Sequence, residues 1–228
     1  MKKRKIMMSV MSAALVGVVA IGGTLAYLSS TTDKVTNTFN VGAGYINDGK
    51  HVGLWLDEVD VTNPQSRTEE GNTYEDMLPG STVVKDPTFH MTEGSTQSYV
   101  IAKVTGMDDA MMAGYIFKNA AGNIDFNGEW VKVAGLDENT EVVTPGGDGY
   151  YIYTNVETGE PAIVDASEAE DDIELVEMFN TVTLTQEIDS SSEMTIANNQ
   201  NVYISGAAVQ ATNNTPEDAI ELAIDLLR

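Results

Sequence analysis

The first 26 residues constrain this chain most, because they predict that everything after them folds outside the cytoplasm. Lys2 to Lys5 form a positively charged start, and the run from Ile6 to Ile21 is almost entirely apolar. Thr24 and Ala26 place small residues at the positions that a signal peptidase reads, so cleavage is expected between Ala26 and Tyr27. The apolar run of about 16 residues is shorter than the roughly 20 that span a bilayer. We therefore expect a secreted protein that keeps no membrane anchor after cleavage.

The chain contains no cysteine, which limits how an exported domain can be stabilised. Stability must then come from a packed core, a metal ion or assembly with other chains. Hydrophobic residues make up 42% of the 228 residues, enough for a packed core. The formal net charge is −23, and removal of the four basic residues in the signal would bring it to −27. Such an acidic chain repels nucleic acid and anionic lipid, so neither is expected as a partner.

Short β-prone runs separated by turn signals fill residues 45–228, which we interpret as one all-β domain. Near-alternating apolar residues from Val52 to Val61 predict a strand with one buried face, in which Trp55 packs within the sheet. The stretch 82–104 predicts a hairpin-like β unit with an edge or bulge at Pro87. The other predicted elements are strands at 130–133, 150–153, 182–188 and 202–209 and a short helix at 107–113.

The C-terminal residues 215–228 predict a helix. Thr215 is placed to cap it, Pro216 takes the first helical position, and Asp218 follows the cap by three residues. Apolar residues recur along one side of the segment. We expect this helix to pack on the sheet.

Several stretches resemble the TasA/camelysin family of SipW-dependent secreted proteins of Gram-positive bacteria, in a clostridial form. The stretches that carry the resemblance are Gly-Gly-Thr-Leu-Ala-Tyr-Leu at 22–28, the segment 33–42, Leu-Pro-Gly at 78–80, Lys-Asp-Pro at 85–87, an apolar-His-apolar triplet at 89–91, and the stretches 99–104, 179–184 and 207–211. The middle, about 107–172, matches poorly and is interpreted as a variable insertion. The resemblance implies a jelly-roll-like β-sandwich with a C-terminal α-helix, preceded by a cleavable signal-peptide helix.

The resemblance also implies a structural function, as a subunit of an extracellular biofilm matrix or surface fibre. A SipW-type signal peptidase would free an N-terminal strand in 27–44, and that strand would add to a sheet edge of the next copy. Val35, Phe39 and Val41 are the candidate pocket-filling residues of this donor strand. Self-association into fibres is then expected, with other matrix components as further partners. The same segment can instead fold back into its own sheet, and the residues alone leave both arrangements open.

Two other functions stay open. The first is a monomeric secreted adhesin or glycan-binding module that uses Trp55, Trp130 or the aromatic run Tyr150 to Tyr153. The second is a camelysin-like secreted metallopeptidase, which the residues disfavour because His51 and His90 are the two histidines and no H-E-x-x-H motif occurs.

No catalytic residue, cofactor or metal ligand is predicted, and we expect no enzyme activity. The acidic segment 166–177 has carboxylates that suit Ca²⁺, but it lacks the spacing of a D-x-[DN]-x-[DN]-G loop. We interpret it as a solvated acidic loop that leads into a strand.

Overall fold

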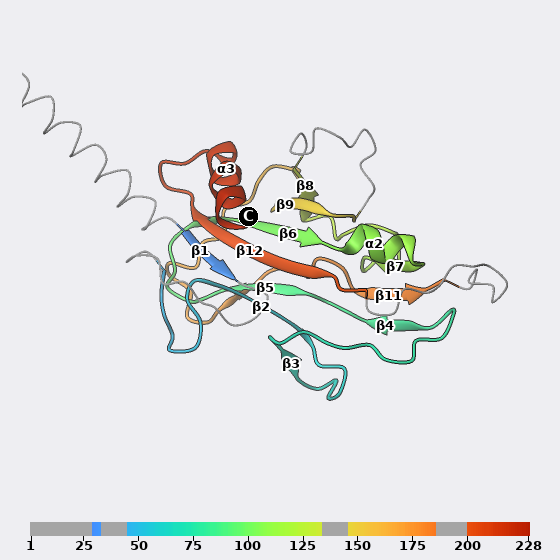
Figure 1. The fold of residues 1–228 in the computed structure, drawn as a ribbon. Helices are drawn as coiled ribbons and strands as arrows, with labels where there is room; N and C mark the ends of the chain where they lie inside the picture. The colour runs from blue at the N-terminus through green and yellow to red at the C-terminus, as the bar shows by residue number, and fades with distance from the viewer. Residues whose placement is uncertain (1–28, 33–44, 134–145, 186–199) are drawn as a thin grey trace, which may run out of the picture.

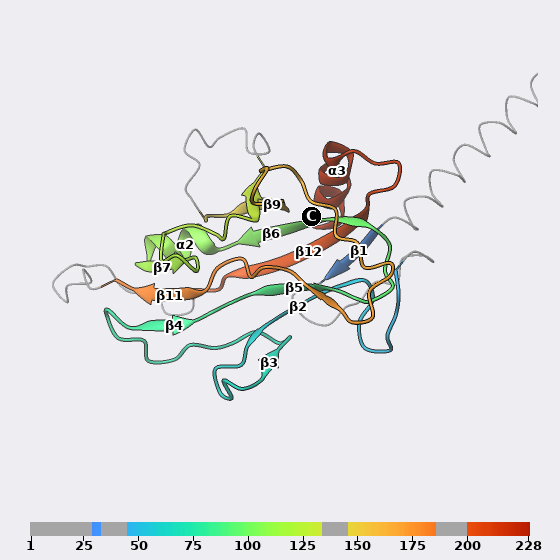
Figure 2. The same cartoon turned by 180° about the vertical axis from the view of Figure 1, so that it is seen from behind.

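The computed structural model describes residues 29–32, 45–133, 146–185 and 200–228. Over these ranges the chain forms antiparallel sheets and a C-terminal helix (Figures 1 and 2). The predicted signal at 1–26 and most of the candidate donor segment at 27–44 lie outside the described residues. Among the residues that are described, no helix has the length and apolar character to cross a membrane.

The largest sheet has five strands in the order β1-β12-β6-β9-β8. Its two longest strands, β6 and β12, pair antiparallel over all eight of their residues. The bounds are β1 Ser29–Thr32, β6 Ser98–Thr105, β8 Trp130–Lys132, β9 Gly149–Tyr153 and β12 Tyr203–Gln210.

Two smaller antiparallel sheets lie beside it, in the orders β10-β5-β2-β3 and β4-β11-β7. A six-residue helix, α2 (Met107–Met112), confirms the short helix predicted between two strands. The bounds of these strands are β2 Leu54–Val59, β3 Arg67–Thr68, β4 Thr82–Val84, β5 Thr88–Met91, β7 Tyr115–Lys118, β10 Ile173–Glu174 and β11 Thr181–Leu184.

The C-terminal helix is confirmed as α3 (Pro216–Leu226) with the predicted cap. The Thr215 hydroxyl accepts a hydrogen bond from the Asp218 backbone N–H, and the Asp218 carboxylate accepts one from the Thr215 N–H. This reciprocal pair satisfies donors that the first helical turn leaves open. Figure 1 shows α3 lying over β6 and β12.

The core lies on both faces of the five-stranded sheet, because alternate residues of β6 and β12 point to opposite faces. On one face Ile101 and Ala207 pack under Ala219 and Ala223 of α3. On the other face the core continues into β2 and β5, and Gly206 of β12 stands directly against them. The side chains on this second face include Leu54, Phe89, Met91, Val100, Ala102, Val104 and Ala208.

The predicted hairpin-like unit at 82–104 is wrong. β4 pairs with β11, β5 pairs with β2 and β10, and β6 pairs with β12 and β9. All four residues of β5 are buried, as are the first five of β6, so each strand needs cover on both faces that a two-stranded hairpin does not supply. The connecting loop passes between the sheets, where the Gly94 N–H donates to the Ala166 carbonyl.

The described residues of the middle of the chain, 107–133 and 146–172, contribute side chains to this core. Phe117, Phe126, Trp130 and Tyr151 from this stretch are all buried. Phe89 of β5 lies 5.4 Å from Trp130, measured between ring centroids.

Candidate functional site

Strand β1 lies at one end of the five-stranded sheet and pairs with β12 (Figure 1). Ser29 stands opposite Val209 and Thr32 opposite Gly206, so strands from near the two ends of the chain meet. β1 covers four residues of β12, whereas β6 pairs with all eight on the other side. We call this pairing the β1–β12 seam, and it is the candidate assembly site.

The sequence-predicted site residues Ala26, Tyr27, Val35, Phe39 and Val41 lie outside the described residues. Of the candidate donor segment 27–44, the structure describes Ser29–Thr32, and it places them in the sheet of their own chain. For these four residues the fold-back arrangement is therefore the one observed.

A second candidate site is a stack of three aromatic rings that sequence reasoning missed. His51 lies flat on one face of Trp55 with ring centroids 4.1 Å apart, and His90 covers the other face at 3.9 Å. The β2–β5 pairing sets Trp55 opposite His90, and the turn at Asp48–His51 brings His51 over the indole. Both histidines are buried, with 7% and 6% of their surfaces exposed.

Carboxylates surround this stack at its ring nitrogens. His51 Nε2 lies 3.1 Å from Glu69 Oε2, and its Nδ1 lies 3.4 Å from Asp48 Oδ2. Trp55 Nε1 donates to Asp172 Oδ2 at 3.0 Å. One nitrogen of His51 and one carboxylate oxygen each of Asp48 and Asp172 lie within 4.8 Å of one another, a geometry that could hold a metal ion.

The far side of the stack ends in an ion-pair network. His90 Nε2 lies 2.9 Å from the Asp57 carboxylate, which also accepts from Arg67 Nε at 2.8 Å. Arg67 then donates to Asp86 and to the Thr88 hydroxyl, each at 2.8 Å. Because every member has a charged or polar partner, we interpret this network as a structural tie between β2, β3 and β5.

Three carboxylates around the stack, those of Asp57, Glu69 and Asp48, favour their ionised forms. Burial opposes ionisation of Asp57, but hydrogen bonds from His90 and Arg67 lower its pKa below the ordinary value. Burial likewise opposes ionisation of Glu69, and bonds from Lys50 and His51 outweigh it and lower the pKa. The pKa of Asp48 is lowered chiefly by backbone N–H donors of His51 and Lys50. These three carboxylates are thus ionised at neutral pH.

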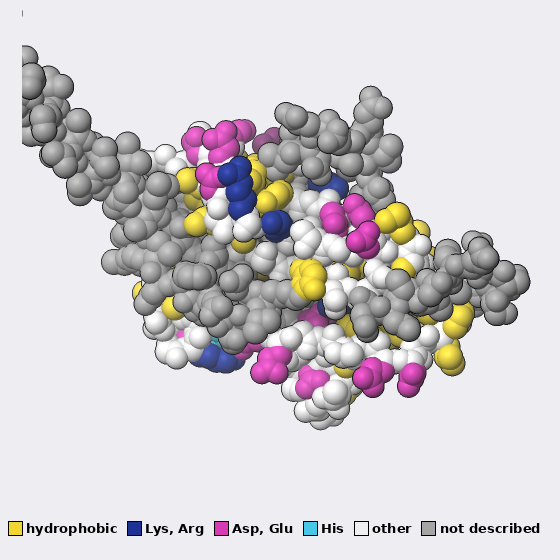
Figure 3. Space-filling view, in the orientation of Figure 1, with side chains coloured by type: hydrophobic (Ala, Val, Ile, Leu, Met, Phe, Trp, Pro, Cys, Tyr) yellow, Lys and Arg dark blue, Asp and Glu magenta, His cyan; other side chains and the backbone are white. Residues whose placement is uncertain are grey.

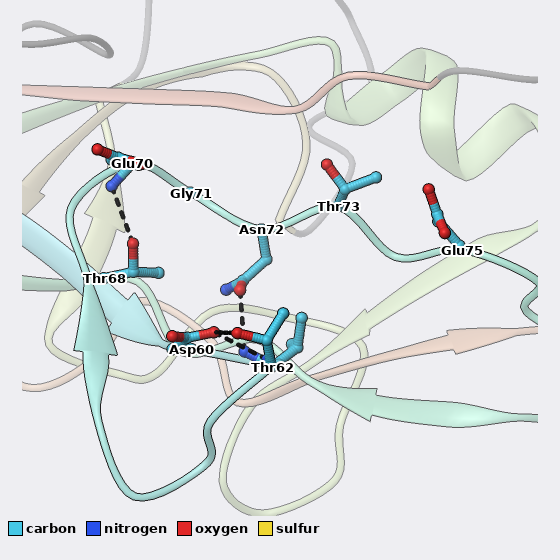
Figure 4. A pocket seen from close by; sticks show the side chains of 9 residues that line it. Asp60, Thr62, Thr68, Glu70, Gly71, Asn72, Thr73 and Glu75 are labelled. Atoms are coloured by element: carbon cyan, nitrogen blue, oxygen red, sulfur yellow. Dashed lines mark hydrogen bonds between the residues drawn. The ribbon is translucent and has the colours of Figure 1, made fainter.

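An open hollow of about 480 Å³ lies beside β3 (Figure 4). Asp60 lines it, but its carboxylate accepts from the Thr62 N–H and hydroxyl, which holds the local turn. Asn72 points toward the same turn and accepts from the Val61 N–H. Glu70 and Glu75 point in different directions in Figure 4, so the described lining residues do not converge on a ligand.

The aromatic residues suggested for glycan binding are mostly used in packing. Trp130 and Tyr151 are buried, with 4% and 2% exposed, and Trp130 Nε1 donates to the Val176 carbonyl. Trp55 packs in its sheet as predicted, with a histidine on each face. These three rings therefore offer no open stacking face to a sugar, whereas Tyr150 and Tyr153 are half-buried.

The acidic segment 166–177 contributes one residue to the stack, Asp172. Four other acidic residues of this segment are exposed, as expected for the predicted solvated loop: Glu168, Glu170, Asp171 and Glu174. His51 and His90 stand on opposite faces of an indole and so do not share one metal position.

Comparison with protein-family models, with curated proteins and with solved structures finds no match. The resemblance to the TasA/camelysin family therefore stays a prediction.

Proposed function

We propose that this protein is a secreted structural subunit of an extracellular matrix or surface fibre of the TasA/camelysin type. In the fibre, β1 of one copy would occupy the β1 position in the sheet of the next copy. Cleavage after Ala26 by a SipW-type peptidase, a jelly-roll-like sandwich, and Val35, Phe39 and Val41 as pocket-filling residues belong to the same proposal.

The observation that carries the proposal is the β1–β12 seam. β1 is a four-residue strand at a sheet end, and it begins three residues after the predicted cleavage point. Main-chain hydrogen bonds contribute about 1 kcal/mol net each, so release of so short a strand costs only a few kcal/mol. A copy that receives β1 from a neighbour regains the same bonds in the same register. Repeated from copy to copy, this exchange does not close and gives a filament.

Disulfide cross-linking tests the exchange cleanly, because the chain has no cysteine of its own. Ser30 stands opposite Ala208 and Thr31 opposite Ala207. Successive antiparallel pairs alternate between a closer and a wider spacing, so one of these two pairs suits a disulfide. We would oxidise Ser30→Cys/Ala208→Cys and Thr31→Cys/Ala207→Cys variants of the cleaved protein at increasing concentration.

We expect ladders of covalent multimers on non-reducing gels, and heterodimers when the single variants Ser30→Cys and Ala208→Cys are mixed. The matched control joins Ser30→Cys with Val131→Cys on β8, the strand at the other end of the sheet, and should give no ladder. Internally cross-linked monomer at every concentration, with no product on mixing, would contradict the proposal.

A further inference from the structure

We propose that Asp48, His51 and Asp172 bind a divalent transition-metal ion of the Zn²⁺ class, which clamps two distant loops together. Asp48 and His51 lie in the loop before β2, and Asp172 directly precedes β10. One potential ligand atom from each residue lies within 4.8 Å of the other two. This inference does not depend on fibre assembly.

Both ring nitrogens of His51 face a carboxylate: Nε2 lies 3.1 Å from Glu69 Oε2, and Nδ1 lies 3.4 Å from Asp48 Oδ2. In the tautomer whose Nε2 carries the hydrogen, Nε2 donates to Glu69 and the lone pair of Nδ1 faces Asp48. Two acceptors then face each other at a ring that is more than nine-tenths buried. A cation between them removes the repulsion, and a carboxylate on the opposite nitrogen is the usual support of a metal-binding histidine.

The two aspartates are held in position before any ion arrives. Asp172 accepts from the Glu93 N–H at 2.8 Å through Oδ1 and from Trp55 Nε1 at 3.0 Å through Oδ2. Asp48 Oδ1 accepts from two backbone N–H groups at 2.6 Å, those of Lys50 and His51. Side chains oriented by such contacts lose little freedom when they bind a metal.

The donor set selects the class of ion. One imidazole nitrogen with two carboxylate oxygens suits Zn²⁺ better than Ca²⁺ or Mg²⁺, which take oxygen ligands almost exclusively. Zn²⁺ lies about 2.0–2.2 Å from such ligands, so in a tetrahedral shell its ligand atoms stand about 3.4 Å apart. Ligand atoms that lie within 4.8 Å of one another need to move closer by at most about 1.4 Å, and water would complete the shell.

Asp48→Asn removes an anionic ligand with little change of shape. An asparagine keeps Oδ1 for the two backbone donors and offers an N–H to His51 Nδ1, so the loop stays folded while an anionic ligand is lost.

The experiment titrates ZnCl₂ into the purified full chain in 0.15 M NaCl by calorimetry and follows the thermal midpoint with and without EDTA. We expect one Zn²⁺ per chain, a Zn²⁺-dependent rise in the midpoint, and binding at least tenfold tighter than that of Ca²⁺. Asp48→Asn and His51→Gln should weaken Zn²⁺ binding at least tenfold, with the metal-free midpoint of Asp48→Asn unchanged.

Asp171→Asn is the matched control, because Asp171 is exposed, precedes Asp172 and lies outside the three-residue group. It should bind Zn²⁺ like the unmodified chain. Equal binding by Asp48→Asn would show that Zn²⁺ collects on the acidic surface and would overturn the proposal. So would the absence of Zn²⁺ binding to the unmodified chain.

Discussion

At the scale of single residues, Asp57 shows how hydrogen bonds offset the cost of burying a charge. Its carboxylate is 7% exposed and is held by His90 and Arg67. A buried carboxylate that loses a partner keeps its desolvation cost without the compensating attraction. Removal of one member of this network should therefore lower the free energy of unfolding more than removal of one member of a surface ion pair.

Replacing Arg67 by methionine should lower the free energy of unfolding at pH 7 by about 2 kcal/mol, below the usual cost for a fully buried pair because Arg67 is partly exposed. Urea unfolding followed by circular dichroism measures this change. Arg228→Met is the control, since Arg228 pairs with Asp225 on the surface and should change the value by less than about 0.5 kcal/mol. Equal effects of the two substitutions would mean that the network adds no stability.

The same carboxylate predicts a pH dependence. Because the folded-state pKa of Asp57 is lowered, its stabilising effect is complete above the unfolded value of about 4 and is lost as pH falls through the folded value. The stability difference between the unmodified chain and Asp57→Asn should therefore shrink between pH 5 and pH 2. A difference that stays constant over this range would contradict the assignment.

At the scale of elements, β12 is the strand around which the layers are built. It pairs with β1 and β6 at its two edges and packs against α3 on one face and against β2 and β5 on the other. Gly206 makes the close approach possible, because a Cβ there would lie 2.3 Å from Phe89 Cε1 and 3.1 Å from Leu54 Cδ2.

Gly206→Ala should lower the free energy of unfolding by about 1–3 kcal/mol, because the added methyl group overpacks this contact. The midpoint of urea unfolding is the measurement. Gly128→Ala serves as the control, since its nearest neighbour is the exposed Val156 side chain at 3.2 Å, which has room to move. An unchanged midpoint for Gly206→Ala would show that the side chains of β2 and β5 move aside at little cost in free energy.

Local patterns predicted many of these elements, but not their partners. The cap and apolar stripe of α3 are contained in fewer than fifteen residues, and the strands at 130–133, 150–153 and 202–209 were found within a few residues of their bounds. Alternation tells which residues face a core, yet it does not say which strand lies alongside. That is why the unit at 82–104 was assigned as a hairpin although its strands belong to three sheets.

The candidate metal site was missed for the same reason. Asp48 and His51 lie far along the chain from Asp172, so no spacing rule connects them. They meet because β5 pairs with β2, which follows the Asp48–His51 turn, and with β10, which Asp172 directly precedes. The signal available in the sequence was Trp55, whose indole N–H needs a partner when it is partly buried.

At the scale of the whole molecule, negative charge dominates. The formal net charge is −23 and would be −27 after the predicted cleavage. Figure 3 shows acidic side chains beside α3 and again near β3 and β4. Copies of the protein must therefore approach one another against a repulsive field.

If the protein assembles as proposed, assembly should be faster in 0.15 M NaCl than in 0.01 M NaCl, because the screening length falls from about 30 Å to about 8 Å. Light scattering and negative-stain microscopy of the cleaved protein measure this, with sucrose at matched osmolality as the control. Assembly that slows as salt rises would indicate that oppositely charged surfaces join the copies.

The β1–β12 seam joins two strands that form at different times. Of the described strands, β1 is the first to be synthesised and β12 the last. Under the proposed export, β1 also emerges first and has no finished partner within its own molecule, whereas any completed neighbour already has a β12. Whether a chain closes on itself or joins a neighbour then depends on the rate of export relative to the rate of molecular encounter. Slow export or crowded sites of export would favour joining.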